Sequence, residues 1–188
     1  MATDSRTDLP LVVGPGAGLA AYLIGYLLTY AVVAPALRDS PLGRVVAALE
    51  GAPPTVDLVG WAFYNAHFVD VVFRAVPILG SRTLSVVGGD GFTPLLFLLA
   101  PALLALAGAA LAVRDGATSQ IRGAAVGAMT LPGYLLAAVA GAIRFEVDVL
   151  GVTGGPEMVT AVGLAGILYP IAFAGGGGAV ASILVARE

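Results

Sequence analysis

Residues 91–113 read GFTPLLFLLAPALLALAGAALAV and contain no charged side chain. A helix of about 20 apolar residues, rising about 1.5 Å per residue, crosses a hydrocarbon core about 30 Å thick. Three other charge-free runs reach this length: Leu9–Leu37, Gly123–Ile143 and Met158–Ala186. The four runs predict an all-α integral membrane protein. We expect a single membrane domain over residues 1–188, with four transmembrane helices in one bundle.

The composition excludes an ordinary soluble domain and several kinds of chemistry. Hydrophobic residues make up 59% of the chain and charged residues 11%, whereas a soluble domain averages about 25% charged residues. The absence of cysteine excludes disulfides, thiolate metal sites and cysteine nucleophiles. The net charge of −3 argues against a nucleic-acid partner. The expected partners are therefore the lipid bilayer and either another membrane protein or a second copy of the chain.

The charged residues indicate a source and an orientation. All basic residues are arginine, and acidic residues are concentrated in the loops, as in proteins of high-salt, GC-rich organisms; codon bias alone is the alternative. Four spans place both ends of the chain on one side. Arginine is denser in those ends and in residues 114–122 than in residues 38–92 and 144–157. The positive-inside rule then places the ends in the cytoplasm and residues 38–92 outside.

The extramembrane or interfacial segment, residues 38–90, contains two short predicted elements. Ser40 and Pro41 supply an N-cap and a first-turn proline for a helix over Leu42–Glu50. Its apolar residues recur at i, i+3, i+4 and i+7, which predicts an amphipathic helix lying on the membrane or on the bundle. Ser81–Val87 has the character of a strand.

Val56–Val76 is the most unusual part of this segment. It is rich in apolar and aromatic residues but also contains two aspartates, an arginine, an asparagine and the only histidine of the chain. Each aspartate or arginine at the centre of a membrane helix costs about 2.5–3.5 kcal/mol on insertion scales. We therefore expect an interfacial or re-entrant helix here rather than a fifth span.

Polar residues in this segment are candidate ligand or partner contacts. On a helix, His67 and Asp70 (i, i+3) and Asp70 and Arg74 (i, i+4) would share one face. His67 could then accept a proton, oriented by Asp70, or belong to a ligand site. The alternative is a polar stripe that faces water or docks the segment onto the bundle. Asn65 and Trp61 complete the set of candidates.

The fourth run contains a candidate helix break. Pro170 is followed by Gly175, Gly176, Gly177 and Gly178, and four glycines in place of alanine disfavour a helix by about 3–4 kcal/mol on a water scale. Transporters use unwound backbone for ion and substrate sites. The alternative is a flat surface for tight packing against the third run. No acidic or amide side chain lies in the four runs, which argues against ion coupling.

Small and aromatic residues in the runs predict helix packing. The pairs Gly14/Gly18 and Gly123/Gly127 are spaced by four, and small residues at this spacing let helices approach closely in lipid. Tyrosines spaced by four line one face of the first run, where we expect them to pack on neighbouring helices; they are Tyr22, Tyr26 and Tyr30.

The chain lacks the residue sets that enzymes and metal sites require. There is no lysine or cysteine, and no serine lies in a nucleophile-elbow context. One histidine with one or two carboxylates cannot fill a zinc shell. We therefore predict no catalytic residue, no metal site and no cofactor.

The segment VGWAFYNAHFV, residues 59–69, follows the first run and precedes an Ala/Leu-rich one. It resembles an uncharacterised family of small multi-pass membrane proteins in halophilic archaea, some of which carry a general transporter label. The resemblance implies a haloarchaeal cell membrane and no catalytic residue, substrate or cofactor. We expect a non-enzymatic structural or accessory subunit whose segment 38–92 contacts partners. The alternative is a small transporter or channel component that uses a broken fourth helix.

Overall fold

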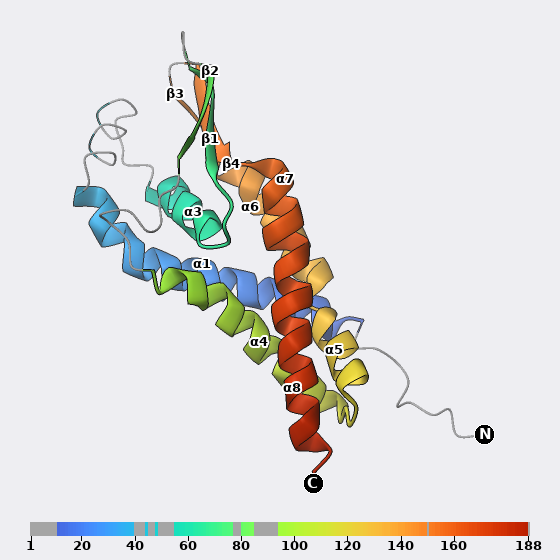
Figure 1. Ribbon diagram of the computed structural model, residues 1–188. Coiled ribbons are helices and arrows are strands. Elements are labelled where there is room, and N and C mark those ends of the chain that lie inside the picture. The colour runs from blue at the N-terminus through green and yellow to red at the C-terminus, as the bar shows by residue number, and fades with distance from the viewer. Residues whose placement is uncertain are drawn as a thin grey trace. The chain divides into compact units, whose positions relative to one another are not determined.

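The computed structural model describes residues 11–39, 44, 48, 55–76, 80–84, 94–149 and 151–187, and these are mostly helical (Figure 1). The longest helices are α1 (Val13–Asp39) and α4 (Leu96–Asp115), and α5 (Gln120–Ala128) leads directly into α6 (Leu131–Arg144). A last helical stretch begins with α7 (Met158–Thr160) and ends with α8 (Gly175–Val185). Within the described residues, four helical stretches are long and apolar enough to cross a membrane. They are Val13–Leu37, Leu96–Asp115, Gln120–Arg144 and Met158–Val185, and they confirm the four predicted apolar helices.

A small antiparallel sheet corrects the all-α prediction. Its strands are β1 (Val71–Val76), β2 (Gly80–Leu84), β3 (Val147–Val149) and β4 (Val152–Pro156), in the order β2-β1-β4-β3. Three of the four strands begin with valine, whose β-branched side chain suits a pleated surface. The strand-like segment predicted at Ser81–Val87 corresponds in part to β2.

Two helices were also predicted within residues 38–90, and the structure describes only one of them in full. The short amphipathic helix predicted at Leu42–Glu50 lies outside the described residues, apart from Arg44 and Ala48, which are helical and exposed. The helix predicted over Val56–Val76 is real but shorter, because α3 ends at Asn65 (Thr55–Asn65) and the chain continues into β1.

The chain divides into two compact units. Unit 1 comprises Met1–Tyr22, Ala100–Ala137 and Gly166–Glu188, and unit 2 comprises Leu23–Leu99 and Ala138–Ala165. Each of the four apolar helices contributes one segment to each unit, whereas α3 and all four strands belong to unit 2.

Helices in unit 1 touch through glycines that face the backbone of a neighbouring helix. A Cβ added to Gly133 would collide with the carbonyl oxygen of Pro15, and one added to Gly18 would collide with that of Thr130. The ring of Tyr22 packs edge-on against Tyr134, with ring centroids 5.4 Å apart. The packing predicted from small-residue spacing and from the tyrosine face is therefore present in this unit.

The predicted break in the fourth run is absent, because the chain stays helical from Met158 to Val185. The helix widens to a π-helix over Ala161–Leu168 and Pro170–Ala174. A proline ring clashes with the carbonyl four residues earlier in an α-helix, and the wider register accommodates Pro170. Gly175–Gly178 form the first turn of α8.

Two of these glycines, Gly177 and Gly178, serve helix packing in unit 1. An added Cβ on Gly177 would collide with the backbone of Ala105, and one on Gly178 would collide with that of Gly123. Close contact with neighbouring helices offsets the low helix propensity that led to the prediction of a break.

Candidate functional site

The candidate site is the cap, which we define as α3 together with strands β1–β4, all within unit 2. Helix α3 is buried along nearly its whole length, from Leu58 to Asn65. Because it is surrounded by protein on all sides of that stretch, it does not lie flat on a membrane as an amphipathic surface helix does. This helix was predicted to be interfacial or re-entrant; its burial makes it an internal element of the cap, and its depth relative to a membrane stays a prediction.

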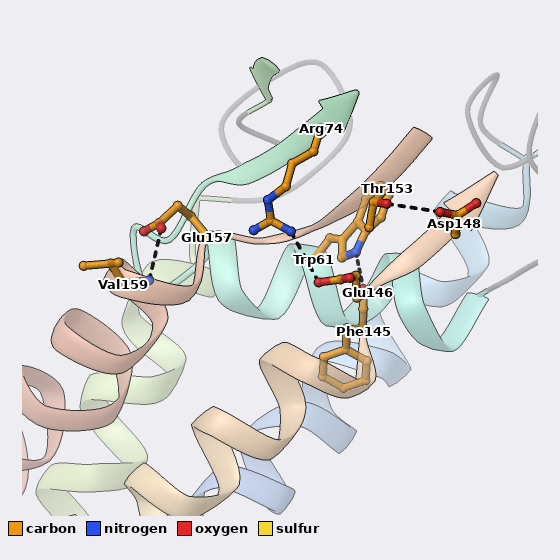
Figure 2. Close-up of polar contacts among 8 residues, drawn as sticks. All are labelled: Trp61, Arg74, Phe145, Glu146, Asp148, Thr153, Glu157 and Val159. Carbon is orange, nitrogen blue, oxygen red and sulfur yellow. Dashed lines mark hydrogen bonds and ion pairs between the residues drawn. The ribbon is translucent and has the colours of Figure 1, made fainter. Parts of the chain in front are cut away.

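Aromatic side chains hold α3 in place by donating hydrogen bonds to backbone carbonyls. Trp61 donates from Nε1 to the carbonyl of Phe145 at 2.7 Å (Figure 2). The Tyr64 hydroxyl donates to the carbonyl of Ala138. Tyr26 donates from α1 to the carbonyl of Val56 at 3.0 Å. Two of these bonds join α3 to α6 and to the residue that follows it, and the third joins α3 to the middle of α1. Hydrogen bonds therefore add to burial in fixing the position of α3.

The C-terminal end of α3 is closed by a Schellman motif. The Val69 N–H donates to the Tyr64 carbonyl at 3.1 Å, and the Phe68 N–H donates to the Asn65 carbonyl at 2.9 Å. In this motif the residue after the cap adopts the left-handed conformation, which is usually left to glycine. Here that residue is Phe68, with φ of 60°.

His67 completes this helix end as a neutral side chain. It is fully buried, and its Nδ1 lies 2.7 Å from the Phe63 carbonyl. Because a carbonyl can only accept, Nδ1 carries the proton of this bond. Burial lowers the pKa of His67 to about 4, although the bond to Phe63 opposes the shift. His67 therefore satisfies a carbonyl that the helix end leaves open.

The structure separates His67, Asp70 and Arg74, which were predicted to share one helix face, and it places the candidate Asn65 before them. Asn65 ends α3, His67 lies in the turn that follows, Asp70 precedes β1, and Arg74 lies within β1. The helical spacing does not apply past Asn65, because the Schellman motif stops the helix and the valines after it form a strand. Trp61, Asn65 and His67 are buried inside the cap, and Asp70 is exposed.

Arg74 belongs to a row of polar residues that crosses the sheet. It lies opposite Thr153 of β4, which in turn lies opposite Asp148 of β3. Thr153 donates to Asp148 at 3.1 Å, and Arg74 lies 3.3 Å from the Glu146 carboxylate (Figure 2). Both side chains of the Arg74–Glu146 pair are nearly half exposed, so the pair contributes at most about 1 kcal/mol.

The other side of the sheet packs on α3. The ring of Phe73 meets that of Trp61 edge-on, with centroids 5.5 Å apart. Gly154 lies opposite Phe73, and a Cβ there would come within 2.8 Å of the Phe73 ring. Glycine at this position leaves room for the two rings.

Two further charged groups connect the cap to the apolar helices. Arg144, at the end of α6, lies 2.7 Å from Asp57 in the first turn of α3. Glu157 caps α7 by accepting from the N–H groups of Thr160 and Val159 at 2.7 and 3.1 Å. The bond from Thr160, with that from Val159 and the charge of Arg74, holds the pKa of Glu157 below its usual range against partial desolvation.

Sequence reasoning missed several residues that build this site. The acidic residues Glu146 and Asp148 alternate with the apolar residues Phe145 and Val147 along the chain, and that alternation is the signal that could have predicted β3. No local signal could have indicated that Trp61 reaches the Phe145 carbonyl or that Glu157 caps a helix beside β1.

The described residues contain no group of three or more His, Asp or Glu side chains that could hold a metal ion. The cap therefore offers buried aromatic packing on one side and a polar surface on the other.

Comparison with known proteins identifies a family. No curated protein and no solved structure matches the chain. A family of unknown function, DUF7978, matches residues 1–185. Because the match covers nearly the whole chain, the protein belongs to this family of unknown function, DUF7978.

Proposed function

We propose that the protein is a non-enzymatic membrane subunit that binds a partner protein through the outer face of its cap. The observation that carries this proposal is that the cap uses its buried and its accessible polar groups differently. The polar groups of Trp61, Tyr64 and His67 form hydrogen bonds to backbone carbonyls that hold α3 in place. The groups that remain accessible lie on the sheet, where a fixed surface suits protein recognition.

The charge of this surface indicates the kind of partner. Its described side chains include the carboxylates of Asp70, Glu146, Asp148 and Glu157. The described cations near them are Arg74, which pairs with Glu146, and Arg144, which pairs with Asp57. Complementary charge steers association and fixes register. The expected partner surface therefore carries arginine or lysine.

The sheet also supports the proposed topology. Strand β1 follows the first apolar helix and β4 precedes the fourth, yet the two strands pair. Pairing requires both loops to lie on one side of the membrane, which two intervening crossings provide. With the positive-inside rule, we place the cap outside and both ends of the chain in the cytoplasm. The lysine-free, acid-rich composition supports a haloarchaeal cell membrane.

The transport alternative loses the feature on which it depended, because the fourth helix is continuous through Gly175–Gly178. His67 is buried and donates to the carbonyl of Phe63 in α3. Neither residue set supports a pathway.

Photocrosslinking in native membranes tests the proposal. A benzophenone side chain is placed at Asp70 or Asp148 on the cap, and at Leu106, an exposed apolar position of α4, as the control. We expect one discrete protein adduct from the two cap positions and none from Leu106. The protein identified in the adduct, purified separately, should bind the wild type and lose binding to Asp148→Arg.

Two outcomes would contradict the proposal. One is the absence of a protein adduct at Asp70 and Asp148 above the level at Leu106. The other is a solute flux through liposomes containing the purified protein that His67→Ala abolishes, because such a flux would restore the transport alternative.

A further inference from the structure

In the turn that joins α3 to β1, Ala66–Val69, every backbone N–H group is hydrogen-bonded within the protein. These four N–H groups donate to backbone carbonyls at 2.8–3.1 Å. The Asn65 side chain donates to the Val69 carbonyl at 3.4 Å, and His67 donates to the Phe63 carbonyl. Irregular backbone in contact with lipid requires this internal satisfaction, whereas a turn in water does not.

Phe68 is the exposed side chain of this turn, and it occupies a strained backbone position. Its side chain is 63% exposed, whereas Ala66, His67 and Val69 are buried. A non-glycine residue in the left-handed region costs about 1–2 kcal/mol. A glycine at this position would remove the strain, so an exposed phenylalanine there needs a favourable environment that compensates for it.

The surface beside Phe68 belongs to the apolar helices. Its ring stacks on Phe97 in the first turn of α4, with centroids 4.7 Å apart and planes at 22°. Leu95 and Leu98 on either side are 69% and 63% exposed. An apolar groove of about 300 Å³ continues this surface onto α1; its lining residues are Leu28, Val32, Leu95, Leu96 and Leu99.

We propose that the α3–β1 turn enters the bilayer, with Phe68 in the hydrocarbon boundary against the first turn of α4. The occupant of this surface is lipid, because the surface is continuous with the exposed faces of two helices that are long and apolar enough to cross a membrane. The turn, rather than α3 itself, is then the membrane-contacting part of the cap. This inference does not depend on the proposed partner.

The charges around the turn fit this placement and limit its depth. His67 is neutral at pH 7, because burial lowers its pKa to about 4, so the turn presents no ionised group to lipid. Asp70 is exposed two residues after Phe68, and its carboxylate must remain in water or headgroups. Phe68 therefore lies at the edge of the hydrocarbon and not at its centre.

Spin labelling tests this depth directly, and the chain has no native cysteine to remove. Single cysteines at Phe68, Leu98 and Asp148 carry a nitroxide in the full chain, reconstituted in phosphatidylcholine vesicles. Oxygen concentrates in hydrocarbon and a nickel chelate in water. We expect the ratio of oxygen to nickel accessibility at 68 to resemble that at Leu98 and to exceed that at Asp148.

Two results would overturn the proposal. A ratio at 68 that matches Asp148 would place the turn in water. A label at 68 shielded from both reagents would place the turn against protein.

A second variant, Phe68→Trp, keeps an aromatic ring if the cysteine variant fails to fold. Vesicles of brominated phosphatidylcholine should then quench a larger share of the fluorescence than in the wild type, whose Trp61 is buried. Equal quenching in the variant and the wild type would contradict the proposal.

Discussion

In unit 1 the helices touch through glycines, whereas in unit 2 they are joined by aromatic side chains that donate to backbone carbonyls. Gly133 and Gly18 in unit 1 leave no room for a Cβ. Trp61 and Tyr26 in unit 2 instead fill the space between helices and end in hydrogen bonds. Close backbone contact gains dispersion energy in lipid, where burial of apolar surface supplies no driving force. The aromatic arrangement suits unit 2, which must also hold a helix and a sheet that are not spans.

The largest expected effect tests the glycine contacts of unit 1. Gly133→Ala should lower the free energy of unfolding by about 3 kcal/mol or more, because the added methyl would push α6 away from α1. The measurement is unfolding by SDS in mixed micelles, followed by helical circular dichroism. Gly16→Ala is the matched control, since nothing lies within 4 Å of its added Cβ. The control should be neutral or stabilising by up to about 1 kcal/mol. Equal losses in the two variants would show that the glycines do not set the helix spacing.

The next effect is the pH dependence of unit 2. The pKa of His67 is about 4 in the folded protein and 6.5 ordinarily, so the unfolded chain takes up a proton first as the pH falls. The stability that comes from keeping His67 neutral is complete above pH 6.5 and is lost towards pH 4. We expect a loss of about 2 kcal/mol between pH 7 and pH 5, measured by SDS unfolding at each pH.

His67→Gln provides the control for this prediction, because glutamine can donate a hydrogen bond but does not titrate. His67 is the only histidine of the chain, so the slope between pH 7 and pH 5 should nearly vanish in the variant. An unchanged slope would assign the pH dependence to other groups.

A smaller effect tests one hydrogen bond between α1 and the cap. Tyr26→Phe removes the hydroxyl that donates to the Val56 carbonyl and should lower the free energy of unfolding by about 1 kcal/mol. Tyr30→Phe is the control one turn further along α1, since its hydroxyl has no hydrogen-bond partner among the described residues. A loss of the same size at Tyr30 would mean that the hydroxyl bond does not hold α3.

The smallest effect concerns the start of the fourth helix. Glu157→Ala removes the acceptor for the N–H groups of Val159 and Thr160 and should cost about 0.5–1 kcal/mol at pH 7. The pKa of Glu157 is lowered in the folded protein, so its contribution is present at neutral pH and declines as acid protonates it. Glu146→Ala, which breaks only the half-exposed pair with Arg74, should cost less. A larger loss for Glu146→Ala than for Glu157→Ala would show that the N-cap of α7 stabilises the protein less than the surface ion pair does.

The apolar helices could be predicted from the sequence because their signal is local. The run at residues 91–113 excludes charge along its whole length, and any such run in a bilayer must form a helix to satisfy its backbone. The glycine packing in unit 1 was one of two open interpretations. Low helix propensity in water made Gly175–Gly178 a candidate break, but in the structure Gly177 and Gly178 pack against the backbones of Ala105 and Gly123.

The sheet and the helix end could not be predicted, because they depend on distant or context-bound partners. Val71 pairs with Pro156, and no spacing within Val56–Val76 reveals a partner so far along the chain. Phe68 occupies the left-handed position at which glycine usually marks the end of a helix, so the sequence lacked this signal for the end of α3. His67, Asp70 and Arg74 consequently looked like one helix face.

The pairing of β1 with β4 has a consequence for how the protein is made. Arg74 and Thr153 face each other in the sheet although about 80 residues separate them along the chain. At a synthesis rate of about 5–20 residues per second, β4 is synthesised roughly 4–16 s after β1. The hairpin of β1 and β2 can form at once, but one edge of β1 stays open until the third apolar helix has been inserted. During that interval the open edge of β1 is exposed to strand-mediated association, and the sheet can be completed only after the third apolar helix has been inserted.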